Sequence, residues 1–226
     1  MMNRKIYAVF VAGGTGTRMG TDMPKQFLEL DGVPVLQRTI SRFIEACPSV
    51  NVITVLPKEH FRTWKELCLK HAFNHPQKIV AGGITRFHSV KAALRQVPDG
   101  AVVAIQDGVR PLLSVNLIRR MLERMETCRA VIPALPVTDS LKYADGTLPE
   151  PDRTVIVGVQ TPQMFLSEEI RAAYETAYEP AFTDDASVAA RKNIPLTFEK
   201  GERFNIKITT PEDLVLAQAL ISSCNL

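Results

Sequence analysis

Hydrophobic residues recur along the chain in two patterns: short apolar runs, and longer stretches whose apolar residues are three or four positions apart. Short apolar runs are typical of strands buried in a sheet, and the longer spacing is typical of amphipathic helices. The runs predict strands over residues 7–12, 51–56, 78–81, 102–106 and 130–134. The helical spacing predicts helices over residues 34–46, 58–70, 86–96 and 114–125. Because strands and helices alternate across short loops, we expect an α/β fold with a mostly parallel sheet covered on both faces.

The pattern changes after Arg129, where extended segments follow one another. Pro136–Tyr143 alternates in part between apolar and polar residues, and Asp145-Gly146 then gives a strong hairpin-turn signal. Arg153–Val159 is predicted as the returning strand. We interpret residues 137–159 as a β-arm that leaves the main sheet and is too small to contain a core of its own. Such an arm favours packing on a second subunit in a homodimer; the alternative is an edge hairpin packed on its own domain.

Helix-start signals mark several of the remaining elements. The expected caps and helices are Ser114 for residues 114–125, Ser167 for residues 167–178 and Thr183 for residues 183–192. Asp184 and Asp185 lie in the first turn of the last of these, where the helix dipole favours acids. Residues 195–199 are predicted as a strand, and Thr210-Pro211 predicts the start of the final helix. No repeat, low-complexity segment or long linker is present, so we expect one domain over residues 1–226.

A glycine-rich turn follows the first predicted strand. Gly13, Gly14 and Gly16 leave the backbone bare, so that its N–H groups can face an anion closely. Arg18 and Lys25 add positive charge a few residues later. The turn is not a P-loop, because no Gly-Lys-Ser/Thr follows it, and it lacks the third glycine of the dinucleotide fingerprint. The combination suits a polyphosphate ligand, although a plain turn is the alternative for the glycines alone.

Composition restricts the class of protein without identifying its substrate. A chain of 226 residues with 46% hydrophobic residues suits one domain that needs no disulfides. The four cysteines are far apart and none forms Cys-x-x-Cys, so we expect reduced thiols in a cytoplasmic protein. We expect no membrane span and no signal peptide, because no apolar run is long enough. The net charge of +3 comes from scattered residues, which indicates a small anionic substrate rather than nucleic acid.

Candidate catalytic chemistry also lies at the ends of later strands. Asp107 directly follows the apolar run over residues 102–106, at the sheet edge where α/β proteins bind ligands. Its carboxylate can bind a divalent metal or a substrate hydroxyl; the alternative is a turn aspartate paired with Arg110, whose guanidinium suits phosphate. Lys207 lies between two isoleucines in an extended segment, so its side chain points away from theirs, although surface lysines are usually solvated. Thr161 follows a strand and by itself indicates only a turn.

Taken together, these segments resemble one family, the 2-C-methyl-D-erythritol 4-phosphate cytidylyltransferases of the non-mevalonate isoprenoid route. The matching segments, in chain order, are AGGTGTRM, PKQF, AGGITRFHSV, QDGVRP, PVTDSLK, QTPQMF, TDDAS and FNIKITTPEDL. They extend over almost the whole chain, and the one departure in the glycine loop is Ala-Gly-Gly where the family usually has Ala-Ala-Gly. The resemblance implies a Rossmann-like three-layer α/β/α nucleotidyltransferase fold with a protruding β-arm.

Two other interpretations remain open at this point. Ribitol-5-phosphate cytidylyltransferases are similar and share PKQF and FNIKITTP, but PVTDSLK resembles the isoprenoid enzymes better. A non-catalytic nucleotide-binding protein of the same fold would be expected to lack some of the cations at the triphosphate. This chain has all of them, namely Arg18, Lys25, Arg110, Arg153 and Lys207.

The resemblance also implies roles for individual residues. The implied catalytic residues are Arg18, Lys25 and Lys207. The implied CTP-binding residues are Ala12, Gly13, Gly14, Thr15, Gly16, Gly83, Arg86, Ser89 and Asp107. The implied residues for the methylerythritol phosphate are Asp107, Arg110, Thr138, Arg153 and Thr161, of which Thr138 and Arg153 lie on the arm and reach the partner subunit's site. The family often has an acid where this chain has Ile84, which puts side-chain recognition of the base in doubt.

The implied reaction is in-line attack of the substrate's phosphate on the α-phosphorus of CTP, with pyrophosphate as the leaving group. The attacking phosphate is already ionised, so we expect no general base. Because two anions must approach each other, the site needs cations, backbone dipoles and Mg²⁺ or another divalent cation. Asp107 is the expected metal ligand; the alternative is a metal bound by the CTP phosphates alone.

Overall fold

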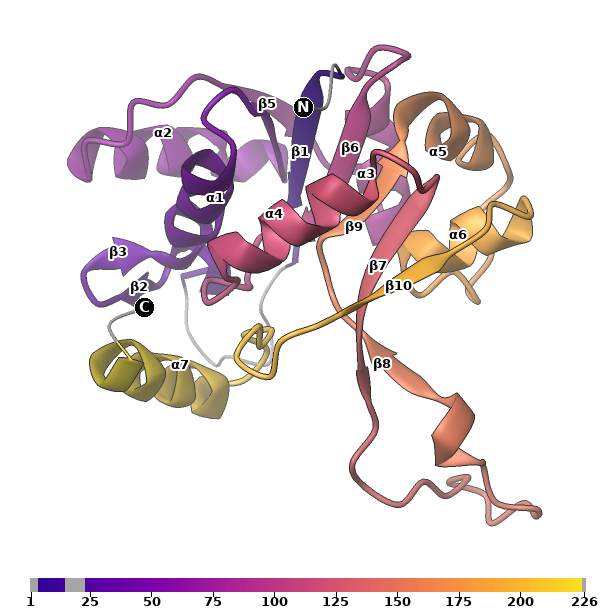
Figure 1. Cartoon of the computed structure of the whole chain (residues 1–226). Coiled ribbons are helices and arrows are strands. Elements are labelled where there is room, and N and C mark those ends of the chain that lie inside the picture. Colours follow the sequence, from indigo (N-terminus) through magenta and orange to yellow (C-terminus); the bar gives the residue numbers. More distant parts are fainter. Residues whose placement is uncertain (1–3, 15–22, 225–226) are drawn as a thin grey trace.

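The computed structural model describes residues 4–14 and 23–224. Its main sheet consists of β1 (Ile6–Val11), β4 (Asn51–Leu56), β5 (Gln77–Ala81), β6 (Val102–Asp107), β7 (Ala130–Pro136), β8 (Val157–Val159), β9 (Gln163–Leu166) and β10 (Thr197–Lys200). The strand order is β10-β7-β9-β6-β1-β4-β5, with β8 paired to β7 (Figure 1). The pairs β1–β4, β1–β6, β4–β5 and β7–β10 are parallel, and β9 lies antiparallel between β6 and β7. The predicted mostly parallel α/β sheet is confirmed.

Helices cover both faces of the sheet. They are α1 (Val35–Ala46), α2 (Phe61–Lys70), α3 (Arg86–Leu94), α4 (Val115–Arg124), α5 (Ser167–Ala173), α6 (Asp185–Arg191) and α7 (Pro211–Cys224). Neighbouring residues of a strand point to opposite faces of the sheet. Val9 therefore packs in the core beneath α3, α5 and α6. Phe10, the next residue, packs in the core beneath α1, α2 and α4. A third apolar cluster, which includes Ile208, joins α7 to the short hairpin of β2 (Glu29–Leu30) and β3 (Val33–Pro34).

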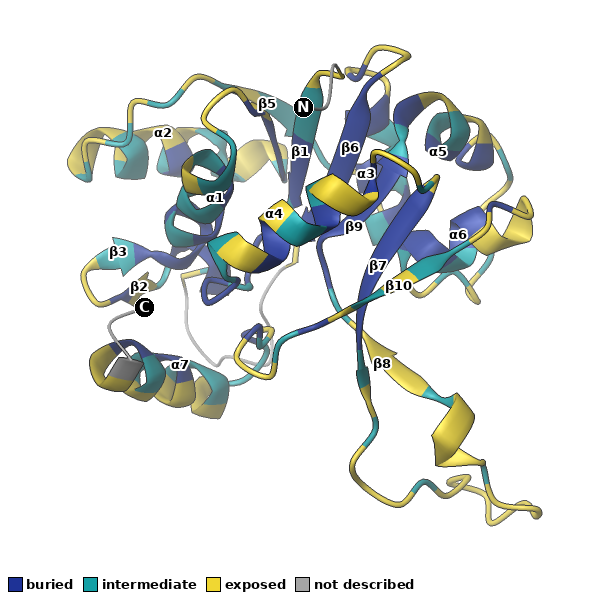
Figure 2. Cartoon of the chain, viewed as in Figure 1, coloured by how far each residue is buried: buried dark blue, intermediate teal, exposed yellow. Residues whose placement is uncertain are grey.

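The predicted arm extends away from the body of the molecule (Figure 1) and most of its residues are exposed (Figure 2). Its base is an antiparallel pairing of β7 with β8, and its tip contains the expected turn, in which Gly146 N–H donates to the Tyr143 carbonyl at 3.0 Å. The returning strand is shorter than predicted, because Arg153–Val155 forms a 3₁₀ turn. The Asp152 carboxylate accepts hydrogen bonds from the backbone N–H and the hydroxyl of Thr154, and such local bonds compete with strand pairing.

Two of the three predicted helix caps are wrong. Ser114 caps α4 as expected, by accepting from the backbone N–H of Leu117. Ser167 instead lies inside α5, and its hydroxyl accepts from Ala101 N–H in the neighbouring chain segment. Asp184, not Thr183, caps α6 in a reciprocal capping box with Ser187, because its carboxylate is the stronger acceptor. α5 also ends at Ala173, earlier than the predicted residue 178.

Candidate active site

The candidate site lies at the carboxyl ends of the central strands. In the sheet, β4 and then β5 lie on one side of β1, whereas the later strand β6 lies on its other side. The strand order therefore reverses between β1 and β6. Ligands of open α/β sheets bind at this point. Asp107, at the end of β6, lies beside Val11, at the end of β1, in the register of the two strands.

Two cavities meet at this edge. The first, of about 420 Å³, is lined by the glycine turn at Gly13 and Gly14, by Lys25 and by the Gly83–Arg86 loop, among others. The second, of about 230 Å³, lies on the side of the β8–β9 connection. Arg86, Asp107 and Lys207 line both. A larger open groove of about 560 Å³ lies at the opposite edge of the sheet, near Tyr7 and Asn51, and includes none of these three.

The loop after β5 is a hydrogen-bonded wall of the first cavity. Gly83 N–H donates to the Ser89 hydroxyl at 3.0 Å, and that hydroxyl donates to the Thr85 carbonyl at 3.0 Å. A Cβ atom on Gly83 would lie 2.4 Å from the Cβ of His88, so only glycine fits here. The three predicted nucleotide residues of this segment, Gly83, Arg86 and Ser89, all line the cavity. Ile84 also lines it and is 97% exposed.

The glycine turn lines the same cavity and lies close to Ser89, whose Oγ would be 3.8 Å from a Cβ atom on Gly13. Ala12, Gly13, Gly14 and Lys25 line the first cavity, as predicted. The Gln26 side chain donates to the Ala12 carbonyl at 2.9 Å, and this bond connects the turn to the Lys25 segment. Lys25 itself is 8% exposed. Three other predicted residues of this region lie outside the described residues: Thr15, Gly16 and Arg18.

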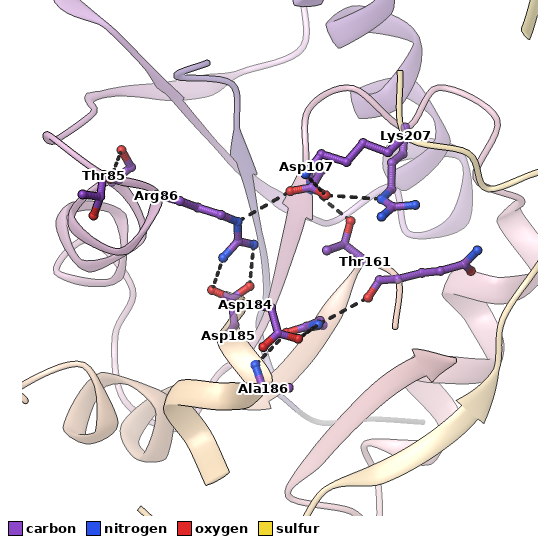
Figure 3. A network of polar contacts seen from close by, with 12 residues as sticks. Thr85, Arg86, Asp107, Thr161, Asp184, Asp185, Ala186 and Lys207 are labelled. Carbon is purple, nitrogen blue, oxygen red and sulfur yellow. Dashed lines mark hydrogen bonds and ion pairs between the residues drawn. The ribbon is translucent and has the colours of Figure 1, made fainter. Parts of the chain in front are cut away.

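Asp107 lies at the centre of a cluster of cations (Figure 3). Its carboxylate is 3.1 Å from Lys207 Nζ, 3.3 Å from Arg110 Nε and 3.6 Å from Arg86 Nε. Burial by itself would raise the pKa of Asp107, but attraction to the three cations outweighs burial and lowers the pKa to about 2. Asp107 therefore stays ionised at neutral pH and pairs with Lys207 and Arg86, which line both cavities, and with Arg110, which lines the second.

Arg86 has a second carboxylate partner that the sequence patterns did not single out. Its guanidinium forms two hydrogen bonds with Asp185, at 2.9 and 2.6 Å, and Asp185 also accepts from the Tyr174 hydroxyl at 2.6 Å. Burial alone would lower the pKa of Arg86, but Asp185 outweighs burial and the pKa is raised. The signal available in the sequence was an acid inside TDDAS, which we interpreted only as a first-turn charge.

Arg110 and Thr161 line the second cavity, as predicted. The Thr161 hydroxyl oxygen accepts from Asp107 N–H at 3.1 Å, so its own proton is available to a ligand. Burial lowers the pKa of Arg110, and Asp107 partly offsets this effect. The second cavity therefore offers a guanidinium and a hydroxyl donor to a phosphate.

The arm residues Thr138 and Arg153 lie apart from this cluster in the chain. Arg153 donates to the Thr138 carbonyl at 2.9 Å, and both line a separate cavity of about 440 Å³ on the arm. Neither lines the two cavities at Asp107. Within one chain, the structure does not bring these two predicted substrate residues to the site.

Comparison with known proteins agrees with this geometry. The sequence profile of the 2-C-methyl-D-erythritol 4-phosphate cytidylyltransferase family matches residues 6–223. The chain belongs to this family. The enzyme of this name from Porphyromonas gingivalis is 48% identical over 226 residues, which cover 98% of this chain and 100% of the relative. The one from Bacteroides thetaiotaomicron is 44% identical over 214 residues, which cover 94% of this chain and 98% of the relative.

Solved structures show the same fold. The crystal structure of 4-diphosphocytidyl-2C-methyl-D-erythritol synthase from Anaerococcus prevotii superposes with a TM-score of 0.82 at 27% identity, covering 97% of this chain and 99% of that one. Family membership confirms the resemblance found in the sequence. It also confirms that the chain is a nucleotidyltransferase and that it has the three-layer α/β fold.

Among the described residues, no three His, Cys, Asp or Glu side chains cluster as a metal site. None of the helices described is long and apolar enough to cross a membrane.

Proposed function

We propose that the first cavity binds CTP, that the second binds 2-C-methyl-D-erythritol 4-phosphate, and that CMP is transferred where the two meet. The observation that supports this assignment is that both cavities share Arg86, Asp107 and Lys207. A transfer between two anions needs one junction with fixed positive charge, and this junction has it. The products would be 4-diphosphocytidyl-2-C-methyl-D-erythritol and pyrophosphate.

The nucleotide is bound by complementary parts of the first cavity. The glycine turn offers backbone N–H groups to the triphosphate, and Lys25 neutralises its charge. The Gly83 loop recognises the base and ribose through its backbone, because Ile84 has no polar side-chain atom to offer. Arg18 is proposed as a further triphosphate cation on the strength of the family resemblance.

Chemistry takes place between the two ligands. An oxygen of the methylerythritol phosphate forms a bond to the α-phosphorus of CTP, and the bond from that phosphorus to the bridging oxygen of pyrophosphate breaks. No proton must be removed from the attacking oxygen, so the residues act by orientation and charge. Lys207 and Lys25 stabilise the charge that develops on the α-phosphate, and Arg110 and Thr161 orient the attacking phosphate.

The residues present fit a divalent cation. Among the described residues that line the first cavity, Asp107 is the one acid. Mg²⁺ in nucleotide sites is commonly bound by one or two carboxylates together with substrate phosphates. Asp107 and the triphosphate would therefore bind it together. When bound, the cation would neutralise triphosphate charge and orient the leaving group.

We further propose a homodimer in which the arm of one subunit completes the site of the other. In their own chain Thr138 and Arg153 line a cavity other than the two at Asp107, and exposed apolar residues occur along the arm at Leu148, Val155 and Val157. Both features are expected of a segment covered by a partner. The arm would supply two more contacts to the methylerythritol phosphate.

The deciding experiment is pyrophosphate release with Mg²⁺ and CTP, with either 2-C-methyl-D-erythritol 4-phosphate or ribitol 5-phosphate as acceptor. We expect release with the first acceptor only. Release with ribitol 5-phosphate alone would change the acceptor and leave the mechanism intact. Release with neither would contradict the assignment of both cavities.

A further inference from the structure

The segment that carries Lys207 belongs to no helix or strand, although Lys207 lies at the junction of the two cavities. Among the described residues, the backbone-to-backbone hydrogen bonds from this segment to the strands and their connecting loops lie at its two ends. Gly201 N–H donates to the Ala134 carbonyl at 2.9 Å, and Ile208 N–H donates to the Val109 carbonyl at 2.9 Å. The stretch between them needs other contacts to hold Lys207 in one place.

Asn205 provides these contacts from the middle of the segment. It is fully buried, at 0% exposure, and its side-chain nitrogen donates to the Thr161 carbonyl at 2.9 Å and to Gln160 Oε1 at 3.3 Å. Its backbone carbonyl accepts from the Arg110 guanidinium at 2.7 Å. One residue therefore joins the Lys207 segment to Thr161 and to Arg110, both of which line the second cavity.

The surrounding bonds require the Asn205 side chain to be a donor here. A carbonyl oxygen such as that of Thr161 can only accept. Gln160 is fixed in orientation because its Nε2 donates to the Glu202 carbonyl at 2.8 Å while its Oε1 accepts from Glu202 N–H at 3.1 Å. The amide nitrogen of Asn205 therefore faces two acceptors.

The same amide is not optimal for stability. Its Oδ1 is buried and has no hydrogen-bond partner among the residues the structure describes. A buried acceptor without a partner is destabilising. Asparagine is therefore better explained at this position by what its nitrogen holds in place than by a gain in stability.

We propose that Asn205 is a positioning residue for the transfer reaction: its side-chain amide fixes the Lys207 segment against the Thr161 loop and so sets Lys207 and Arg110 relative to Asp107. This inference rests on the proposed function of the two cavities. Asn205 lines neither of them and so acts through other residues. Its loss affects the acceptor more than the nucleotide, because Arg110 and Thr161 line only the second cavity, whereas CTP retains the glycine turn, Lys25 and the Gly83 loop.

The test compares Asn205→Ala and Asn205→Asp by steady-state kinetics with both substrates. For Asn205→Ala we expect kcat to fall about tenfold or more and KM for the methylerythritol phosphate to rise about tenfold, with KM for CTP changed by less than about threefold. Asn205→Asp keeps the size of the side chain but places a carboxylate against two acceptors. We expect it to be at least as impaired as Asn205→Ala, whereas a role in packing alone predicts a milder effect.

Ser167→Ala is the matched control. Ser167 is also fully buried and bonds a neighbouring chain segment, but at Ala101, at the other end of β6. We expect it to lower the melting temperature without separating the two KM values. Equal changes of both KM values in Asn205→Ala, kinetics like the wild type, or an Asn205→Asp variant milder than Asn205→Ala would each overturn the proposal.

A wild-type enzyme that does not turn over the acceptor would contradict the proposed function rather than this inference. In that case a crystal structure of Asn205→Ala tests whether Asn205 positions Lys207 and Arg110. The proposal expects Lys207 Nζ to move away from Asp107 and the Arg110 bond to the carbonyl of residue 205 to break. An unchanged network would overturn it.

Discussion

At the scale of single residues, the site is an electrostatic arrangement around Asp107. One carboxylate with 7% exposure has ion-pair contacts to Lys207, Arg110 and Arg86. In a buried environment these contacts are stronger than in water, and they position the cations before a ligand arrives. Under the proposed function, charge placement rather than acid–base chemistry is what these side chains would contribute to the transfer.

Removing either proposed catalytic lysine tests this view. We expect Lys25→Ala and Lys207→Ala each to lose about 100–1000-fold in turnover, by analogy with the deletion of one donor to a developing oxyanion. Circular dichroism and the melting temperature should show that both variants fold, because the described core consists of other residues. Near wild-type turnover in either variant would remove that lysine from the mechanism.

The lowered pKa of Asp107 predicts a pH effect on stability. The folded pKa of about 2 is below the unfolded value of about 3.9, so the stabilisation by the ionised group is fully present above about pH 5 and decreases below it. This contribution, about 2 kcal/mol, is lost as the pH falls through the folded pKa. Urea unfolding of metal-free wild-type and Asp107→Asn protein should show their difference in unfolding free energy shrinking between about pH 5 and about pH 2.5. A constant difference over this range would contradict the assigned shift.

At the scale of elements, loops at strand ends form the site and the strands and helices hold those loops. The Gly83 loop shows this clearly, because the Ser89 hydroxyl in α3 bonds both Gly83 and Thr85. Thr85 in turn caps α3 by accepting from His88 N–H. The helix that packs on the sheet thus sets the shape of the loop that lines the first cavity.

We expect Gly83→Ala to weaken CTP binding about tenfold or more, because the new Cβ would lie 2.4 Å from His88 Cβ and the loop must move. Isothermal titration with CTP measures the effect. Gly158→Ala is the control, since a Cβ there meets only the Leu135 carbonyl, at 3.8 Å. Equal CTP affinity of Gly83→Ala and wild-type protein would show that the loop adapts and that its backbone does not recognise the nucleotide.

At the scale of the whole molecule, the arm separates two predicted substrate contacts from the rest of the site. Its return strand leads directly into Gln160 and Thr161, so the arm and the second cavity are continuous in the chain. The arm's base is fixed by pairing to β7, and its tip projects from the body (Figure 1). This arrangement suits a segment that reaches another subunit.

Mixing two inactive variants tests whether the arm acts across subunits. A dimer of one Lys207→Ala chain and one Arg153→Ala chain should contain one intact site, formed by Lys207 of one subunit and Arg153 of the other. Random mixing makes half of the dimers of this kind, so about a quarter of wild-type activity should return. If the arm serves its own chain, no mixed dimer contains an intact site and no activity returns.

The sequence by itself determined the class of fold and indicated where the candidate site would lie. Buried strands and amphipathic helices have local periodicities, so most sheet strands and the helices of the body could be predicted within a few residues. The exceptions are the early end of α5 and the central strand β9 over Gln163–Leu166, which was not predicted from the sequence. Because parallel strands end at one edge, the positions of Gly83, Asp107 and the glycine turn after their strands already indicated a common site. Specific segments such as FNIKITTPEDL indicated the family.

Only the tertiary structure decided which side chains hold the site residues in place. Arg86 and Asp185 are 99 residues apart in sequence, and Asn205 meets Thr161 across 44 residues. No local period encodes such contacts, because they depend on how helices and loops pack on the sheet. The 3₁₀ turn at Arg153 and the cap at Asp184 escaped prediction for a related reason: several nearby polar groups compete for the same backbone N–H groups, and three-dimensional geometry selects one.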